Sequence, residues 1–389
     1  MDNPPNNKIR LLTISQYGEA LAAPAADSYS GAQKRQLDYA RMTEQYLVIV
    51  PSAKPLQVNV LAENLRIFPV SAGNKILFIL KACRLAGKLI RQEKINCLAC
   101  DNPFLLATAL LWLKKRFRIP LIVNSMAEMV DNDYYLRERP SNILKNWLGK
   151  IAFKHADIIR VSTEAEVSNL VKRDYRKEKI IKVPFYIDFE KFELPVSAED
   201  LRKDLLGEAF DKIVLFVGRF AKQKDLPTLI KAAGLVIKNK PRTLFLSIGY
   251  GPELSAIVKE IDSSGLAANF KILGKVRYNE MAKYYLASDI FCITSLYEGT
   301  CMVLLEAGIC GLPIVATKFA GAVDLVKNGV NGFLAEIGDY KEVSEKVSFL
   351  LERSNEVRVM GENNRRIIKE DFTREGALKK FQELMDLVI

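Results

Sequence analysis

The sequence predicts an α/β protein built from two doubly wound, parallel-sheet domains in tandem. Its length of 389 residues fits two domains of about 100–200 residues each. Short apolar runs alternate with helix-period segments in both halves. The stretch 184–211 interrupts this alternation with Pro195 and a polar, acidic composition. We therefore expect an N-terminal domain over 1–195 and a second domain over 196–371.

In the first half, six short apolar runs have the length and composition of β-strands. Amphipathic segments with helical spacing lie between several of them. Such strand–helix alternation predicts a parallel sheet with helices on both faces. The expected strands are 9–14, 46–50, 95–99, 121–123, 158–161 and 180–183, and the clearest helices are 33–45, 75–92 and 104–117.

The second half restarts the same rhythm. After a strand at 213–217, apolar residues from Leu226 to Ile237 recur on one face of a helix. In open sheets of this kind, ligands bind beyond the carboxyl ends of the strands. Further strands are expected at 244–248, 270–273, 290–294 and 314–316, with helices near 253–263, 278–287, 301–310 and 322–327.

With 49% hydrophobic and 26% charged residues, the composition is ordinary for a soluble globular protein. No apolar run reaches the roughly 18 residues that a membrane-spanning helix needs, and the N-terminus lacks the apolar core of a signal peptide. The six cysteines show no disulfide-scaffold spacing. Cys97 and Cys100 form a C-x-x-C without a second pair, so we expect small buried residues on a strand instead of zinc ligands.

The positive charge is concentrated in the first half. The net charge is +11, and residues 1–195 hold 30 basic and 20 acidic side chains, against 27 and 26 in the remainder. An anionic partner would therefore meet the N-terminal domain. On the helix expected at 75–92, Lys81, Arg84, Lys88 and Arg91 share one face. This pattern fits either a solvated helix face or attachment to an anionic membrane surface. No nucleic-acid motif or aromatic–basic interleaving accompanies it, so nucleic acid is not expected.

Two constellations in the second half carry candidate chemistry. The first strand ends at Gly218, and Arg219 and Lys224 follow it. Glycine lets a phosphate approach the backbone, while a guanidinium and an ammonium are the usual partners of a diphosphate. A solvated basic loop is the alternative.

The second constellation follows the strand at 290–294. Glu298 lies in a loop, and a helix is expected from about Thr300, so that its free amides form an anion site. Glu306 lies about two turns along this helix among apolar neighbours, where a carboxylate needs a partner.

Taken together, residues 212–335 resemble the retaining GT-B glycosyltransferases of family 4, a fold of two Rossmann-like domains facing across a cleft. Glu298 and Glu306 resemble the E-x7-E signature of this family. Several motifs occur in the same order as in this family, and this shared order is more specific than any single motif. They are Val217–Arg219 with Lys224, then 249–254, 273–276, 287–290, 298–306, 311–317 and 329–334.

The resemblance implies a role for each site residue. Arg219 and Lys224 would neutralise the diphosphate leaving group, Glu298 would contact the donor sugar and Glu306 the ribose. The base would lie near Val276. The amides from Gly299 to Met302 would hold phosphate and sugar. The donor-binding set is Gly218, Gly249, Gly251, Val276, Gly299, Thr300, Cys301, Met302 and Glu306.

The resemblance is weaker in the first half. It implies that Gly31 lies near the donor phosphate or the acceptor, and that a tail helix at 372–389 crosses back onto the first domain. Two departures stand out. Family members often carry a histidine after the strand at 121–123, where this chain has Asn124 and Ser125, which we take as substitutes. Cys301 stands where many relatives have glycine.

We therefore expect a retaining glycosyltransferase that moves a hexose from a nucleoside diphosphate sugar to a glycan or lipid-linked acceptor. It would be cytoplasmic, with possible peripheral attachment to the inner membrane face. The alternatives are another GT-B enzyme, such as a sugar-nucleotide epimerase or a phosphorylase, and a non-catalytic nucleotide-sugar-binding protein. No cofactor or metal is expected. The D-x-D-like run Asp131–Asp133 lies in a polar loop instead of at a strand end.

Overall fold

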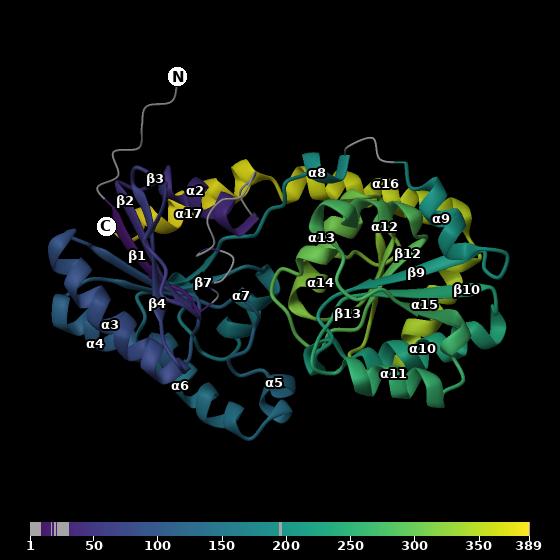
Figure 1. Ribbon diagram of the computed structural model, residues 1–389, viewed down its shortest axis with the longest axis horizontal. Coiled ribbons are helices and arrows are strands. Elements are labelled where there is room, and N and C mark those ends of the chain that lie inside the picture. Colours follow the sequence, from purple (N-terminus) through teal and green to yellow (C-terminus); the bar gives the residue numbers. More distant parts are fainter. Residues whose placement is uncertain (1–8, 17, 19–20, 22–30, 194–196, 389) are drawn as a thin grey trace. The chain divides into compact units, whose positions relative to one another are not determined.

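The computed structural model describes residues 9–16, 18, 21, 31–193 and 197–388, and the chain divides into two compact units (Figure 1). Unit 1 comprises Met1–Pro184 and Glu375–Ile389, and unit 2 comprises Phe185–Arg374. The division lies within the expected linker but eleven residues before the expected boundary at 195. The reason is that Phe192 is buried in the core of unit 2, where its ring meets those of Tyr278 and Tyr285.

Unit 1 contains an eight-stranded sheet in the order β3-β4-β2-β1-β5-β6-β7-β8. Every pair is parallel except β3 with β4. This pair was not expected, because its strands carry exposed or half-exposed residues such as Val60 and Arg66 in place of a continuous apolar run. The strands are β1 Arg10–Ile14, β2 Gln45–Ser52, β3 Asn59–Ala62, β4 Leu65–Ser71, β5 Cys97–Cys100, β6 Leu121–Asn124, β7 Ile158–Val161 and β8 Ile180–Lys182.

Helices cover both faces of this sheet, as a parallel sheet requires. Helices α3, α4 and α6 form one layer, and α2 and α17 lie on the opposite face (Figure 1). The C-terminal helix α17 belongs to unit 1, where Phe381 stacks on Tyr39 with 4.0 Å between ring centroids. The helices are α2 Gly31–Ala40, α3 Lys75–Gln92, α4 Leu105–Phe117, α5 Asp133–Glu138, α6 Ser141–His155, α7 Glu164–Val171, the short 3-10 helix Lys177–Lys179 and α17 Arg374–Asp386.

Unit 2 contains a fully parallel six-stranded sheet in the order β11-β10-β9-β12-β13-β14. Counted from its first strand, this order is 3-2-1-4-5-6, the doubly wound arrangement of nucleotide-binding folds. The order reverses between β9 and β12, so the loops after these two strands flank the switch point. The strands are β9 Lys212–Val217, β10 Thr243–Ile248, β11 Phe270–Ile272, β12 Ile290–Ile293, β13 Ile314–Thr317 and β14 Gly332–Ala335.

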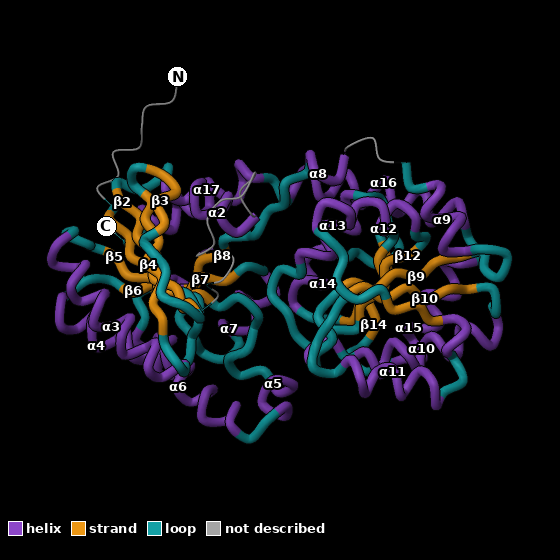
Figure 2. The backbone as a smooth tube through the Cα atoms, in the orientation of Figure 1, coloured by secondary structure: helices purple, strands orange, loops and turns teal. Residues whose placement is uncertain are grey.

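The helices of unit 2 lie on both sides of its sheet (Figure 2). Those expected from the sequence are present within a few residues of the expected bounds. The expected helices are α10 Leu226–Asn239, α11 Leu254–Ser263, α12 Met281–Ala287, α13 Met302–Ile309 and α14 Ala320–Leu325. Unit 2 also contains α8 Glu190–Glu193, α9 Glu199–Leu206, α15 Tyr340–Leu351 and α16 Ser354–Asp371, with 3-10 turns at Lys222–Lys224, Ala267–Asn269 and Tyr278–Glu280.

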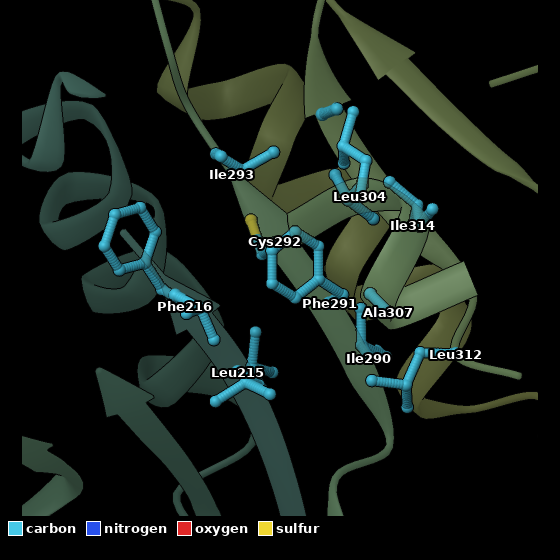
Figure 3. Close-up of a cluster of buried hydrophobic side chains, with 14 of the residues drawn as sticks. Leu215, Phe216, Ile290, Phe291, Cys292, Ile293, Leu304, Ala307, Leu312 and Ile314 are labelled. Carbon is cyan, nitrogen blue, oxygen red and sulfur yellow. The ribbon is translucent and has the colours of Figure 1, made fainter. Parts of the chain in front are cut away.

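The core of unit 2 forms around its central strands. Every residue of β12 is fully buried, because helices cover both faces of a parallel sheet. Figure 3 shows Phe291 of β12 beside Ala307 of α13, with Leu304 of the same helix nearby and Phe216 of β9 on the other side of the picture. The helix that carries Glu306 therefore packs into the core of unit 2.

Within the described part of the chain, no helix combines the length and the apolarity needed to cross a bilayer. The six cysteines are free thiols, and five of them are buried. Cys97 and Cys100 are the first and last residues of the buried strand β5.

Candidate functional site

The central feature of the candidate site is a buried ion pair between Lys224 and Glu298. Lys224 ends a 3-10 turn in the loop after β9, and Glu298 lies in the loop after β12. These are the two strands between which the sheet order reverses. Nζ of Lys224 donates a hydrogen bond to Oε1 of Glu298. The structure therefore brings two predicted site residues together where α/β sheets bind ligands.

Several hydrogen bonds join the two loops and hold this pair in place. The Leu296 amide donates to the Gln223 carbonyl at 2.8 Å, and the Gln223 side chain donates to the Tyr297 carbonyl at 2.8 Å. The hydroxyl of Thr294 donates to the backbone carbonyls of Lys224 and Asp225 at 3.1 and 2.9 Å. The position of Lys224 thus depends on the loop that carries Glu298.

The surroundings of the pair favour its charged form. Only 11% of the Lys224 side chain and 12% of the Glu298 side chain are exposed. Ser295 Oγ donates to Oε1 of Glu298 at 2.7 Å. Burial by itself lowers the pKa of Lys224, but the charge of the Glu298 carboxylate and its hydrogen bond act in the opposite direction, so that the pKa of Lys224 is raised. The ammonium is therefore kept charged in a mostly buried position.

Cys301 belongs to this cluster. It is 3% exposed, and burial together with the nearby Glu298 carboxylate raises the pKa of its thiol well above the usual value. The thiol is consequently neutral, and it occupies space beside the Lys224–Glu298 pair.

The glycines predicted to bind the donor let two loops approach each other closely. A Cβ on Gly249 would lie 1.8 Å from the carbonyl oxygen of Gly218, and one on Gly251 would lie 2.1 Å from that of Phe220. A Cβ on Gly218 would lie 3.2 Å from Cε of Lys224. The loops after β9 and β10 therefore pack backbone against backbone beside the lysine.

The helix after Glu298 begins later than predicted. Helix α13 starts at Met302 instead of Thr300, with Cys301 as its N-cap, and no side chain caps it. Gly299, Thr300 and Cys301 form the loop before it. A Cβ on Gly321 would lie 2.1 Å from the Gly299 carbonyl oxygen, so the start of α14 supports this loop at close range.

Glu306 accepts a hydrogen bond from a residue that was not predicted from the sequence. It is 6% exposed, and the hydroxyl of Tyr285 on α12 donates to its Oε2 at 2.8 Å. Burial raises the pKa of Glu306 to about 7, although the hydrogen bonds from Tyr285 and Tyr278 lower it. Tyr285 was missed because it is one of two adjacent tyrosines in an ordinary amphipathic segment. The only sequence signal for this contact was that a buried tyrosine hydroxyl needs a hydrogen-bond partner.

The other predicted donor residues lie farther out. Arg219 follows Gly218 in the same loop, and its residue is exposed. Val276 is half-buried and packs against the core of unit 2. Beside it, the ammonium of Lys275 lies 5.3 Å from the ring centroid of Tyr250. Arg219 thus has room to move towards an anion, whereas Lys224 is already fixed.

In unit 1, Asn124 and Ser125 lie at the carboxyl end of β6. The Asn124 amide donates to Oδ1 of Asp101 at 2.8 Å, and the Ser125 hydroxyl donates to Oε1 of Glu166. Asn124 is 4% exposed, and its Oδ1 has no hydrogen-bond partner among the described residues. Gly31, the first residue of α2, is exposed. Neither Asp101 nor Glu166 was predicted from the sequence as a contact of these residues.

The D-x-D-like run has structural contacts. Oδ1 of Asp131 pairs with Lys150 at 2.9 Å and accepts a hydrogen bond from Asn146 at 3.0 Å. Oδ1 of Asn132 caps α5, which begins at Asp133. The residues that the structure describes contain no group of three or more His, Cys, Asp or Glu arranged to hold a metal ion.

Comparison with known proteins links the second unit to glycosyl transfer. Residues 197–367 match the sequence model of the family glycosyl transferases group 1. The match covers less than half of the chain but most of unit 2, including the Lys224–Glu298 pair and Glu306. Unit 2 therefore resembles the domain that this family model describes.

Two curated relatives are 30% identical to this chain. One, an uncharacterized glycosyltransferase of Methanocaldococcus jannaschii, matches over 247 residues, which are 62% of this chain and 61% of that protein. The other, UDP-Gal:alpha-D-GlcNAc-diphosphoundecaprenol alpha-1,3-galactosyltransferase of Escherichia coli, matches over 216 residues, 54% of each protein. The chain thus spans about three fifths of the length of the first relative and about half of the length of the second.

The fold extends the likeness to the whole chain. Sucrose-phosphate synthase from Thermosynechococcus elongatus superposes with a TM-score of 0.80 over 97% of this chain and 98% of that one, at 19% identity. At such low identity the likeness shows the fold alone, which is the GT-B fold of two parallel-sheet α/β domains.

Proposed function

We propose that this chain, whose residues 197–367 match glycosyl transferases group 1, is a retaining glycosyltransferase of family 4. It would move a hexose from a nucleoside diphosphate sugar to a glycan or lipid-linked acceptor. The observation that carries the proposal is the buried ion pair of Lys224 and Glu298 at the switch point of unit 2.

Glycosyl transfer breaks the bond between the anomeric carbon and the donor diphosphate. Negative charge develops on the departing diphosphate while the sugar becomes oxocarbenium-like. A fixed cation beside the leaving group lowers this barrier most effectively where water is excluded. Lys224 meets both conditions, because its ammonium is charged and 89% of its side chain is covered. Arg219, on the exposed part of the same loop, would supply a second cation.

Glu298 would serve the sugar. Its carboxylate already accepts hydrogen bonds from Lys224 and Ser295, so its orientation is set before substrate binds. Its Oε2, which accepts neither of these two bonds, can accept hydrogen bonds from sugar hydroxyls. Glu306, held by Tyr285, would accept from the ribose in the same way.

The relatives support this choice of substrates. The name of the galactosyltransferase of Escherichia coli gives it a uridine diphosphate sugar as donor and a diphosphoundecaprenol-linked sugar as acceptor. For this chain, a lipid-linked or glycan acceptor is proposed on that similarity. Asn124, with its buried and unpartnered Oδ1, and Ser125 and Gly31 are its candidate contacts in unit 1.

The proposal is tested by measuring nucleoside diphosphate release from UDP-, GDP- and ADP-sugars in the presence of mixed glycan and lipid-linked acceptors. We expect release with one donor class and a product whose anomeric configuration equals that of the donor, read by NMR. An inverted product would contradict retention. Binding of a nucleotide sugar without release from any donor would instead identify a non-catalytic binding protein.

A further inference from the structure

Three neighbouring helices of unit 1 carry basic residues and no acidic ones. Helices α3, α4 and α6 together contain eleven Lys or Arg, five, three and three respectively, and no Asp or Glu. They form one layer: Gly87 of α3 faces Leu113 and Phe117 of α4, and Thr108 of α4 donates to the Leu148 carbonyl of α6 at 3.3 Å. The outer side of this layer, whose helices lie at the lower left of Figure 1, is therefore positively charged.

The same layer exposes large apolar side chains from all three helices. Both tryptophans of the chain are among them, Trp112 on α4 and Trp147 on α6, with exposed fractions of 64% and 58%. We call this surface the α3–α4–α6 face and define its apolar part as Ile76, Leu80, Trp112, Ile143, Leu144 and Trp147.

Apolar residues of this face lie towards the starts of the helices, and most of its exposed basic residues lie in the later turns, although Lys75 and Lys81 are exposed in the first half of α3. The apolar residues of α3 and α6 lie in the first half of each helix, and Trp112 lies midway along α4. Exposed basic residues follow them towards the C-terminal ends. All three helices connect parallel strands, so they run in one direction and their first turns lie at the carboxyl edge of the sheet. The exposed basic residues of the later turns are Arg84, Lys88, Arg91, Lys115, Arg116 and Lys154.

Exposed apolar groups gathered on one face mark a docking surface, whereas single exposed ones are ordinary. The helices of unit 2 provide the contrast, since exposed apolar residues such as Leu235 and Val258 occur singly there. Tryptophan favours the boundary between water and lipid, and Lys or Arg near an anionic bilayer contributes about 1 kcal/mol each. Long basic side chains can also reach headgroups while their stems cover apolar surface.

We propose that the α3–α4–α6 face docks on an anionic lipid bilayer, with Trp112 and Trp147 at the level of the headgroups. Charge complementarity selects this occupant. A second copy of the chain, paired through the same face, would bring two sets of basic residues together without an acidic partner. The inference rests on the surface of unit 1 and needs no catalytic activity. Membrane docking can therefore fail while the proposed function holds, and the proposed function can fail while membrane docking holds.

The experiment uses the full chain and its own tryptophans. Because both lie on this face, their emission reports on it directly. Vesicles of phosphatidylcholine containing phosphatidylglycerol should shift the emission to shorter wavelength and sediment with the protein. Vesicles of phosphatidylcholine alone should do neither at the same lipid concentration. Added salt should weaken the binding, because exposed charges are screened within about 10 Å at 0.1 M ionic strength.

Two variants test the two parts of the face. Ile143→Ser with Leu144→Ser keeps both tryptophans and should lower vesicle partitioning by at least about tenfold, because burial of two aliphatic side chains is lost. Arg84→Glu with Lys88→Glu should abolish the preference for phosphatidylglycerol. The matched controls are Val258→Ser with Val359→Ser, and Lys238→Glu with Lys259→Glu, exposed positions on helices of unit 2 that should bind as the unchanged protein does.

Circular dichroism and thermal melting of each variant establish that it is folded. The proposal is overturned if the unchanged protein shows no emission shift with anionic vesicles, or if the unit 2 controls lose binding as strongly as the face variants. It is also overturned if the emission shift follows protein concentration without lipid, which would identify the face as a contact between copies. An emission shift of equal size with short RNA in place of vesicles would also overturn the proposal.

Discussion

Lys224 donates a hydrogen bond to Glu298, a residue 74 positions later in the chain. The two side chains come from loops that follow neighbouring strands at the switch point of the second sheet, and both are mostly buried. A buried ion pair contributes little net stability, because removing two charges from water offsets their attraction. Under the proposed function, the pair keeps a cation charged at the place where an anionic substrate would bind.

Replacing Lys224 with methionine should abolish nucleoside diphosphate release. Methionine keeps the apolar stem but removes the charge, so we expect kcat/KM to fall by about 10²–10³ or more, as for loss of one fixed transition-state donor. Lys222→Met, two residues earlier and exposed, is the matched control and should lose less than about twofold. Equal losses in the two variants would contradict the assigned role.

Replacing Glu306 with glutamine should change how stability depends on pH. In the folded chain its pKa is about 7, above the usual 4.5, so the folded state holds this proton more tightly than the unfolded state. The resulting stabilisation is complete below about pH 4.5 and is lost as the pH rises through 7. The unchanged protein should therefore lose up to about 3 kcal/mol relative to Glu306→Gln between pH 5 and 8. Urea unfolding at several pH values measures this, and parallel curves would refute the raised pKa.

Replacing Tyr285 with phenylalanine should destabilise unit 2. The substitution leaves the buried Glu306 carboxyl without its 2.8 Å donor, and a buried group that loses its hydrogen bond costs about 1–3 kcal/mol. Tyr284→Phe, one residue earlier and only half-buried, serves as the control and should stay within about 0.5 kcal/mol. If chemical denaturation ranks the two variants equally, the Tyr285–Glu306 contact has no energetic role.

Replacing Gly249 with alanine should disrupt the site loops. Its φ is 153°, and the new Cβ would lie 1.8 Å from the Gly218 carbonyl oxygen, so the backbone beside Lys224 must move. We expect a loss of nucleotide-induced thermal stabilisation, even if the variant folds. Gly234→Ala, within α10 and with its nearest neighbour at 3.7 Å, should be neutral or slightly stabilising. An unchanged nucleotide-dependent shift in Gly249→Ala would contradict the close approach.

Replacing Asn124 with alanine should affect the acceptor and spare the donor. Its buried Oδ1 has no hydrogen-bond partner among the described residues and can accept one hydroxyl. We expect the acceptor KM to rise by about tenfold, because loss of one hydrogen bond costs roughly 1.4 kcal/mol. Nucleotide binding should be unchanged. A calorimetric loss of nucleotide affinity in this variant would show that Asn124 serves the donor or the fold instead.

Much of the fold could be predicted because the signals are local. Apolar runs such as Ile213–Val217 identify a buried strand without any knowledge of its neighbours, and the order of the motifs from Val217 to Leu334 indicates the second domain. Strands β3 and β4 escaped notice because their side chains are partly exposed and their sequence lacks a continuous apolar run. The start of α13 was placed two residues early, since Thr300 is a more common helix-capping residue than Cys301.

Candidate site residues could be named from the sequence, but their contacts could not. Gly218, Lys224, Glu298 and Glu306 were named from residue type, spacing and the resemblance to a known family, and their roles stay predictions. Their pairing, the hydrogen bond from Tyr285 and the buried Asn124–Asp101 contact join residues from different elements, and no spacing rule encodes them.

The sequence by itself determined the two α/β domains, the glycine-rich turns and the basic character of the first domain, because these follow from local backbone preferences and composition. Only the tertiary structure decided which buried charge faces which, and that Trp112 and Trp147 point to solvent instead of the core. The physical reason is that burial and pairing belong to the packed arrangement of elements. An apolar residue on a helix has the same local signature whether a sheet or solvent lies against it.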